Sequence, residues 1–452
     1  MTPAVLAAVF TALLGWRTPL TAQDHYSRVL MLANEGETVA TVRAGCAGCD
    51  WGQAGRESVA LTITLDGKYS QHLQLVRGEA MADYRIALGH LTNGPHRLAI
   101  DRDPALTAPG AGPATIDVPD FDVFNPGQSA DYTALSMAPI VYARPNTVGK
   151  FTDLPLLMWY EAAPTARGRQ YRYSVIFSNE DGGTQTDRLM ATWGRTTDIE
   201  FIYGVEIDDS GRIVAEEFQG PGHEVPAFTG KHEGRHPLVW VSTDNNMVSE
   251  SGPTNIRYAP MPEKFDLTDQ SREAVMDASP WTYAIASVEM RREGKVADDA
   301  PPGLNKIPDP RRFVYVEACG HVGNAALSLS VGTFSRQPQP ATGSVRLQPD
   351  LIWTASDRGL PQYRIVRDGC FRIATPLPAG TKPSDIRAVR IQAFERPPAA
   401  GAPKAASDPV VVARINKMFM LDEHDLPGES ILKWEGPVTI RAGGDPVEVT
   451  IR

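Results

Sequence analysis

At 452 residues, the chain is too long for one ordinary hydrophobic core, and a usual size of roughly 100–200 residues per domain predicts about three domains. Hydrophobic residues make up 42% of the chain and charged residues 22%, which excludes a disordered composition. The net charge of -10, without any cluster of Lys and Arg, excludes nucleic acid as a partner bound through a general basic surface.

The chain begins with an apolar run that is typical of an export signal. The run extends from Pro3 to Leu14, and small residues near Ala22 offer a cleavage site. We therefore expect residues 1–23 to be a signal peptide and the mature protein to be secreted or periplasmic. An uncleaved anchor is the alternative, but a bilayer needs ~20 apolar residues, and neither this run nor any later segment is that long.

Residues 24–135 have the pattern of an immunoglobulin-like β-sandwich. Ser58 to Leu65 alternates and leads into the turn Asp66–Gly67, which is a strong hairpin signal. Tyr84 to Leu88 then leads through Asn93–Gly94 to the next short strand. Strands spaced about ten residues apart predict a sandwich of ordinary size.

Residues 136–300 form a predicted central domain that is rich in strands. Tyr171 to Phe177 and Ile199 to Ile207 contain many aromatic and β-branched residues, and each is followed by a turn with acidic residues and glycine. Asp269 to Ala278 is the one convincing helix, with Thr268 or Asp269 as its N-cap and Pro280 just beyond its end.

Residues 311–452 form a predicted second sandwich, which begins after a proline-rich break. Ala326 to Val331 and Ala388 to Phe394 alternate between apolar and polar residues, as strands do. The predicted fold class is therefore mostly β and multi-domain, with two β-sandwich-like modules flanking a central β-rich domain with little helix.

The chain has four cysteines, an even number that favours disulfides in an exported protein. Cys319 and Cys370 lie in apparent strands of the C-terminal segment and are one expected pair, although four cysteines allow three connectivities. Cys46 and Cys49 lack the sequence context of a redox, haem or zinc motif. We interpret them as a tight structural disulfide in a loop.

Acidic and imidazole side chains are concentrated between Asn179 and Asn246. They are Glu180, Asp181, Asp198, Glu200, His223, Glu224, His232, Glu233, His236 and Asp244. Such groups together can bind a divalent metal or share acid–base catalysis. The candidate catalytic residues are Asp198, Glu200 and His236, and the candidate metal ligands are His223 and His232. A divalent metal is the one cofactor that these residues suggest, and the sequence does not firmly imply it.

A second set of central residues is suited to binding a ligand. Trp193 and Trp240 offer aromatic surfaces, and Asp244 and Asn245 follow an apolar strand in a polar loop. Most aromatic residues on strands pack inward, so a core role is the alternative for both tryptophans.

The acidic residues also have simpler interpretations. Glu180–Asp181 and Asp208–Asp209 precede glycine-containing turns, where carboxylates cap their own backbone. Asp198 and Glu200 alternate with apolar residues and would form a solvated strand face. The histidines would then be ordinary polar loop residues.

Residues 173–247 resemble the vacuolar protein sorting-associated protein 62 family. The matching pieces are Ser174 to Asn179, Asp198–Ile199–Glu200 and Arg235 to Val241, which give a strand, an acidic strand and a His-Pro strand in that order. The family carries tryptophan where this chain has Ile199, and it also carries an upstream histidine that this chain lacks. The resemblance implies that the specific activity belongs to the central region, and it implies no particular chemistry.

Three functions follow as hypotheses. The first is an exported protein whose central domain binds a glycan or another envelope component. The second is a metal-dependent hydrolase that uses His223, His232 and His236 with Asp198 or Glu200. The third is a purely structural envelope protein. Convergence of the acidic and imidazole groups in one cleft would favour a specific site over dispersed surface residues.

Overall fold

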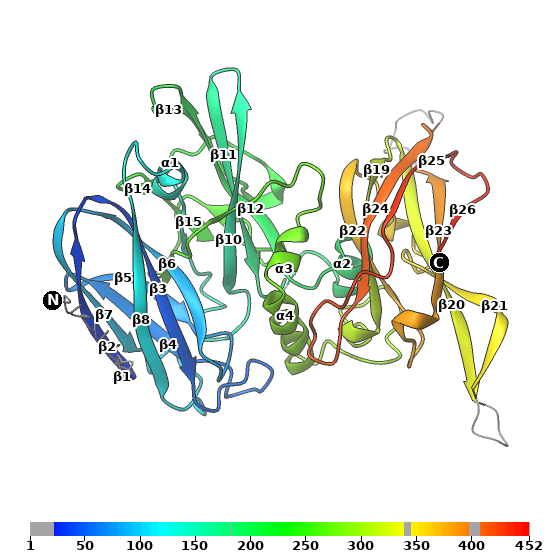
Figure 1. Cartoon of the computed structure of the whole chain (residues 1–452), viewed down its shortest axis with the longest axis horizontal. Helices are drawn as coiled ribbons and strands as arrows, with labels where there is room; N and C mark the ends of the chain where they lie inside the picture. The colour runs from blue at the N-terminus through cyan, green and yellow to red at the C-terminus, as the bar shows by residue number, and fades with distance from the viewer. Residues whose placement is uncertain (1–21, 181, 339–344, 397–406, 452) are drawn as a thin grey trace, which may run out of the picture.

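The computed structural model describes residues 22–180, 182–338, 345–396 and 407–451, so nearly all of the expected signal peptide, residues 1–23, lies outside these ranges. Strands account for 47% of the structure and helices for 10%, which confirms the predicted mostly β fold. Figure 1 shows a sandwich at each end of the molecule, with helices α3 (Ala274–Ala278) and α4 (Trp281–Arg292) between them.

The N-terminal sandwich consists of two four-stranded antiparallel sheets, ordered β1-β8-β3-β6 and β2-β7-β4-β5. Its core contains fully buried side chains such as Leu61 and Ile100. The predicted turn Asp66–Gly67 joins β4 to β5, whereas Asn93–Gly94 carries the chain from one sheet to the other. The strands are β1 (Ala22–Gln23), β2 (His25–Leu32), β3 (Gly36–Cys46), β4 (Ala60–Leu65), β5 (Lys68–Gln74), β6 (Ala82–Leu91), β7 (Gly94–Arg102) and β8 (Ala114–Phe124).

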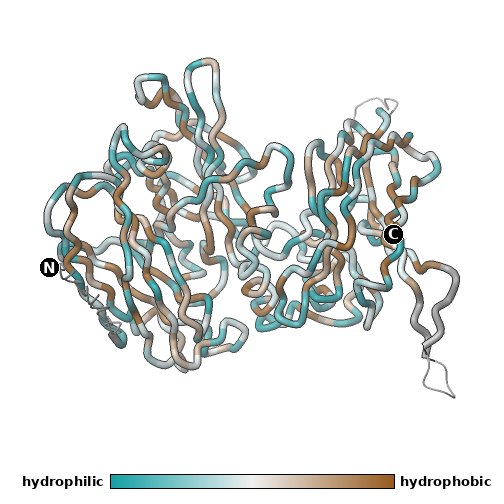
Figure 2. The backbone as a smooth tube through the Cα atoms, viewed as in Figure 1, coloured by the Kyte–Doolittle hydropathy of each residue, from teal (hydrophilic) through white to brown (hydrophobic). Residues whose placement is uncertain are grey.

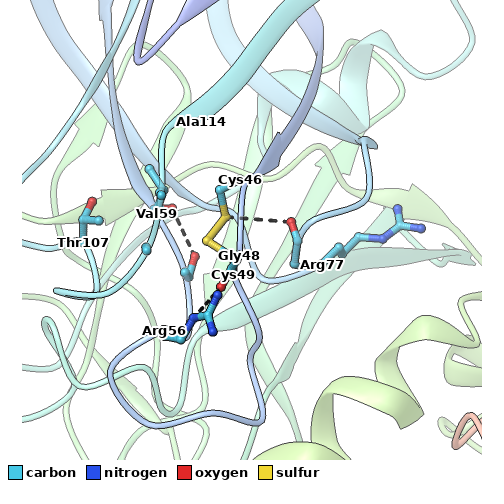
Figure 3. Close-up of a disulfide and its surroundings, with 12 residues drawn as sticks. Cys46, Gly48, Cys49, Arg56, Val59, Arg77, Thr107 and Ala114 are labelled. Atoms are coloured by element: carbon cyan, nitrogen blue, oxygen red, sulfur yellow. Dashed lines mark hydrogen bonds between the residues drawn. A yellow bond between two sulfur atoms is a disulfide. The ribbon is translucent and has the colours of Figure 1, made fainter.

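A disulfide closes the loop that follows β3, as predicted. Cys46 is bonded to Cys49, and the Arg56 Nε donates a hydrogen bond to the Gly48 carbonyl oxygen over 2.9 Å (Figure 3). The same loop carries Trp51, whose Nε1 donates to the buried Glu289 carboxylate of α4 over 2.8 Å. This loop therefore attaches the N-terminal sandwich to the central helices.

The central region contains two further sheets, ordered β13-β12-β11-β10-β18 and β14-β15-β9-β17, with β16 paired to β15. Buried aromatic residues such as Tyr173 and Tyr203 fill the core beside them. The strands are β9 (Ile140–Tyr142), β10 (Pro155–Thr165), β11 (Gly168–Phe177), β12 (Asp198–Asp208), β13 (Ile213–Glu217), β14 (His232–Glu233), β15 (His236–Val241), β16 (Val248–Ser249), β17 (Arg257–Tyr258) and β18 (Glu263–Lys264).

The helices of the central region differ from the prediction. The expected helix from Asp269 to Ala278 is reduced to α3, which begins at Ala274. Pro280 lies just beyond the end of α3, as expected, and it also begins the next helix, because its φ of -59° and its missing N–H suit the first turn of α4. The structure also contains α1 (Tyr132–Ser136) and α2 (Thr186–Trp193).

The C-terminal sandwich pairs a sheet ordered β22-β19-β24-β25 with one ordered β21-β20-β23-β26. The predicted disulfide between Cys319 and Cys370 joins β19 to β22, where the two residues are direct partners in the antiparallel register. Figure 2 shows that hydrophobic residues recur along the strands of both sandwiches. The strands are β19 (Phe313–His321), β20 (Ala325–Pro338), β21 (Val345–Ala355), β22 (Gly369–Pro376), β23 (Ile386–Glu395), β24 (Val410–Met420), β25 (Trp434–Ile440) and β26 (Val447–Thr450).

A buried cluster joins the C-terminal sandwich to the central helices. Tyr283 of α4 makes edge contacts with the rings of Tyr315 and Phe419 in β19 and β24. The fully buried Arg372 of β22 lies beside them and forms ion pairs of 2.7 Å with Asp277 and with Glu317. The C-terminal sandwich is therefore packed tightly against the segment that carries α3.

Candidate functional site

A polar cavity of about 480 Å³ opens beside the start of β12, among α2, the loop after β13 and the segment before α3. Three carboxyl groups, three guanidinium groups, amides and one indole surround it. The lining residues are Glu180, Gly183, Thr184, Arg188, Leu189, Trp193, Arg195, Asp198, Glu200, Gln219, His223, Asn245 and Arg272.

Asp198 and Glu200 reach this cavity from the first and third residues of β12. Residues two apart on a strand point to the same face, so the two carboxyl groups are directed together. Asp198 is 1% exposed and Glu200 is 8% exposed. The alternative of a solvated strand face is therefore wrong, because neighbouring segments cover this end of the sheet.

Side-chain amide groups donate hydrogen bonds to the two buried carboxyl groups. Asn246 Nδ2 donates to Asp198 Oδ2 over 3.1 Å, and the side-chain amide of Gln219 donates to Glu200. Asn246 has a φ of 53°, a left-handed conformation that asparagine tolerates better than most residues. This backbone geometry positions its buried side chain against Asp198.

Glu180 supplies the third carboxyl group from the loop after β11. Its Oε1 accepts a hydrogen bond from the Thr184 backbone N–H over 2.8 Å, so it caps its own turn as one interpretation of the sequence expected. The residue is nevertheless buried and lines the cavity. Both roles apply to the same side chain.

The environment of these carboxyl groups favours their protonated forms. Burial, together with the nearby Asp198, raises the pKa of Glu180 to about 8. Burial and the neighbouring Glu200 raise the pKa of Asp198 to about 7, although Arg195 opposes the change. Burial also raises the pKa of Glu200, against the charges of Arg272 and Arg195. Near neutral pH, the cavity therefore offers both hydrogen-bond donors and acceptors.

Trp193 stands at the end of α2, where Gly194 terminates the helix with a left-handed φ of 60°. Its indole is partly exposed and lines the cavity. The guanidinium carbon of Arg367 lies 3.8 Å from the ring centroid, and those of Arg195 and Arg272 lie 5.7 Å away. These cation–π contacts gather positive charge at one end of the cavity.

The structure separates the predicted ligand-binding residues. Trp193 and Asn245 line the cavity, but Trp240 and Asp244 do not. Trp240 instead stacks on Tyr142 with 4.3 Å between ring centroids. Asp244 forms an ion pair with Arg144 behind the Asn245 loop.

The predicted histidines are also dispersed. His223 lines the cavity, with 3.3 Å between its Nδ1 and Gln219 Nε2. His232 pairs with Glu216 over 2.7 Å, and His236 contacts Glu37 of the N-terminal sandwich over 3.2 Å. Within the described ranges, no group of three His, Cys, Asp or Glu side chains is arranged to hold a metal ion. His236 therefore acts as a contact between the central region and the N-terminal sandwich.

Several cavity residues were not identified from the sequence. Gln219, Arg188 and Arg195 lie close to predicted residues in the chain, but nothing in their local pattern distinguishes them. Arg272 comes from a distant segment that the fold brings to the cavity. Glu180 belongs to the acidic group that the sequence predicts, but not to its candidate catalytic residues or metal ligands.

No family model matches the chain, and no curated protein matches it. Two solved structures of a lectin from Pleurotus ostreatus align with most of it. The apo form is 11% identical, with 93% of this chain and 85% of that chain covered and a TM-score of 0.13. The complex with GalNAc is 10% identical, with 93% and 86% covered and a TM-score of 0.12. TM-scores this low do not demonstrate a common fold.

Proposed function

We propose that the cavity beside β12 binds a glycan or a similar polyhydroxylated component of the cell envelope. The observation that supports this function is the convergence of Glu180, Asp198 and Glu200 with the indole of Trp193 in one cavity of about 480 Å³. Sugar hydroxyl groups both donate and accept hydrogen bonds, so they suit a wall of carboxyl and amide groups. A cavity of this size is also within the usual range for small-ligand sites.

The binding test uses the purified protein and a broad glycan array. We expect Glu200→Gln and Trp193→Ala each to weaken retention of the bound glycan about tenfold or more, because the first replaces a carboxyl group that binds hydroxyl groups and the second removes an aromatic contact surface, and about 1.4 kcal/mol corresponds to a factor of ten. Trp240→Ala provides the matched control, since Trp240 stacks on Tyr142 away from the cavity. Affinities are measured by calorimetry, and circular dichroism checks the fold of each variant.

Two results would contradict this proposal. Retention of no glycan by the wild-type protein would leave the structural envelope role as the remaining hypothesis. Loss of retention in Trp240→Ala but not in Glu200→Gln would place the binding site elsewhere in the central region.

Acid–base hydrolysis of the bound ligand is a second candidate function. The observation that favours it is the convergence of three buried carboxyl groups, of which Glu180 has a pKa of about 8 and therefore keeps its proton near neutral pH. A protonated acid beside an ionised carboxylate is the pairing that general acid–base catalysis requires. Such a site needs only the side chains of this protein, whereas the hydrolase expected from the histidines would also need a bound metal ion.

The hydrolase test follows the glycans that the protein retains. We expect wild-type protein to release new reducing ends, and we expect Glu180→Gln and Glu200→Gln each to reduce the rate about a hundredfold or more, in keeping with the usual contribution of a general acid or base. Treatment with a chelator should leave the rate unchanged. Full activity in both variants would exclude this chemistry, and loss of activity with the chelator would restore the metal-dependent hypothesis.

We also propose that the protein is secreted or periplasmic. Both disulfides are formed, as is typical of proteins from oxidising compartments. Across the part of the chain that the structure describes, no helix has the length and apolar character needed to cross a bilayer.

A further inference from the structure

Two guanidinium groups that line the cavity form no ion pair within the part of the chain that the structure describes. Arg188 is exposed on α2, and Arg272 is half-buried in the segment before α3. Among the residues that the structure describes, neither guanidinium group is within 4.0 Å of a carboxylate, and neither donates a hydrogen bond to another residue. Arg195, the third cavity arginine, is instead paired with Glu273 over 3.1 Å.

A fourth arginine strengthens this positive end of the cavity. Arg367 comes from the C-terminal sandwich, where its guanidinium group donates to the Thr192 carbonyl oxygen over 2.6 Å and covers the Trp193 ring. Burial, opposed by Glu273 and assisted by the nearby charges of Arg272 and Arg195, lowers the pKa of Arg367 to about 10. Positively charged groups that are held close together and partly shielded from water favour the binding of an anion.

The carboxyl groups of the cavity do not cancel this charge at neutral pH. Three carboxyl groups and three guanidinium groups line the cavity, and Arg195 lies 3.8 Å from Asp198. Glu180 and Asp198 are substantially protonated there, because burial raises the pKa of each one to about neutrality or above. Near neutral pH the cavity therefore combines guanidinium groups with protonated carboxyl groups that can donate and accept hydrogen bonds.

We infer that the ligand is an acidic glycan, whose carboxylate lies between Arg188 and Arg272 while its hydroxyl groups contact Glu180, Asp198 and Glu200. Guanidinium groups match carboxylates in geometry, since they form two parallel hydrogen bonds. This inference rests on the proposed glycan-binding function and specifies its substrate class as a saccharide that contains uronic acid.

The test compares each glycan with its own neutral derivative. The probes are polygalacturonate, alginate and hyaluronate oligosaccharides, each with a methyl-esterified form in which the carboxylate charge is removed. We expect the wild-type protein to bind at least one acidic oligosaccharide about tenfold or more tightly than its ester, and we expect added salt to reduce this preference.

Variants then locate the preference within the cavity. Arg188→Gln and Arg272→Gln should each reduce the ratio between acid and ester to below about threefold while the ester remains bound, because each removes one half of the carboxylate site. Arg212→Gln is the matched control, since Arg212 is exposed on the β12–β13 hairpin and pairs with Asp208. Arg188 is exposed, so we expect Arg188→Gln to leave the fold intact.

The outcomes separate this inference from the function on which it rests. Equal binding of acid and ester, or an undiminished preference in both Arg188→Gln and Arg272→Gln, overturns the inference and leaves glycan binding intact. Tighter binding of sulfated than of carboxylated oligosaccharides also overturns it, because a sulfate would then be the recognised anion. Failure of the wild-type protein to bind any glycan overturns the proposed function itself.

Discussion

Replacing Arg372 by methionine is expected to reduce the free energy of unfolding by about 3–5 kcal/mol, because it leaves the buried Glu317 carboxylate without its cation and removes one of the two cations beside the half-buried Asp277. Arg372 is fully buried, and it forms ion pairs of 2.7 Å with both Asp277 and Glu317. Its side chain also packs against Gly194, where an added Cβ would lie only 2.6 Å from the Arg372 Cγ. Loss of this arginine therefore disturbs both the C-terminal sandwich and the end of α2.

Urea denaturation followed by tryptophan fluorescence measures this effect. Arg390→Met is the control, because Arg390 is half-buried at the surface and loses only a 3.4 Å pair with Glu448 and a contact with the Trp353 ring, which together contribute about 1–2 kcal/mol. The double variant Arg372→Met with Glu317→Gln should recover part of the loss, since it removes one of the unpaired charges. Equal stability of Arg372→Met and Arg390→Met would show that the buried ion pairs contribute little.

Stability is expected to fall as the pH rises from about 5 to 8, by roughly 1–3 kcal/mol, because of the carboxyl groups in the cavity. The pKa of Glu180 is about 8 and that of Asp198 about 7, both higher than in the unfolded chain. The folded protein therefore holds more protons than the unfolded chain across this range. Raising the pH removes those protons, which favours unfolding.

Glu180→Gln isolates this contribution. The variant keeps an oxygen that accepts the hydrogen bond from the Thr184 N–H but cannot ionise. We expect its stability to change less with pH than that of the wild-type protein, so that the two curves diverge toward pH 8. Glu448→Gln, at an exposed position, serves as the control for any removal of a carboxyl group. Parallel curves for wild-type protein and Glu180→Gln would show that Glu180 ionises normally in the fold.

Local pattern was enough to predict much of the fold. The alternation of Ser58 to Leu65 and the turn Asp66–Gly67 gave a hairpin, since alternate side chains must face a shared core and the turn residues accept its backbone angles. The helices were harder, because Pro280 both ends one helical pattern and begins another. Short helices such as α2 depend on packing more than on their own sequence.

The sequence by itself determined the mostly β class and the two sandwiches, because these depend on periodicity and turn residues. Its even number of cysteines favoured disulfides, but the structure decided which of the three connectivities forms. It also directed attention to Asp198 and Glu200. Only the tertiary structure decided that they meet Glu180, Trp193 and Arg272 in one cavity, while His232, His236 and Trp240 lie elsewhere. Burial, counter-ions and pKa values arise from segments distant in the chain, and their meeting is set by how the sheets and helices pack.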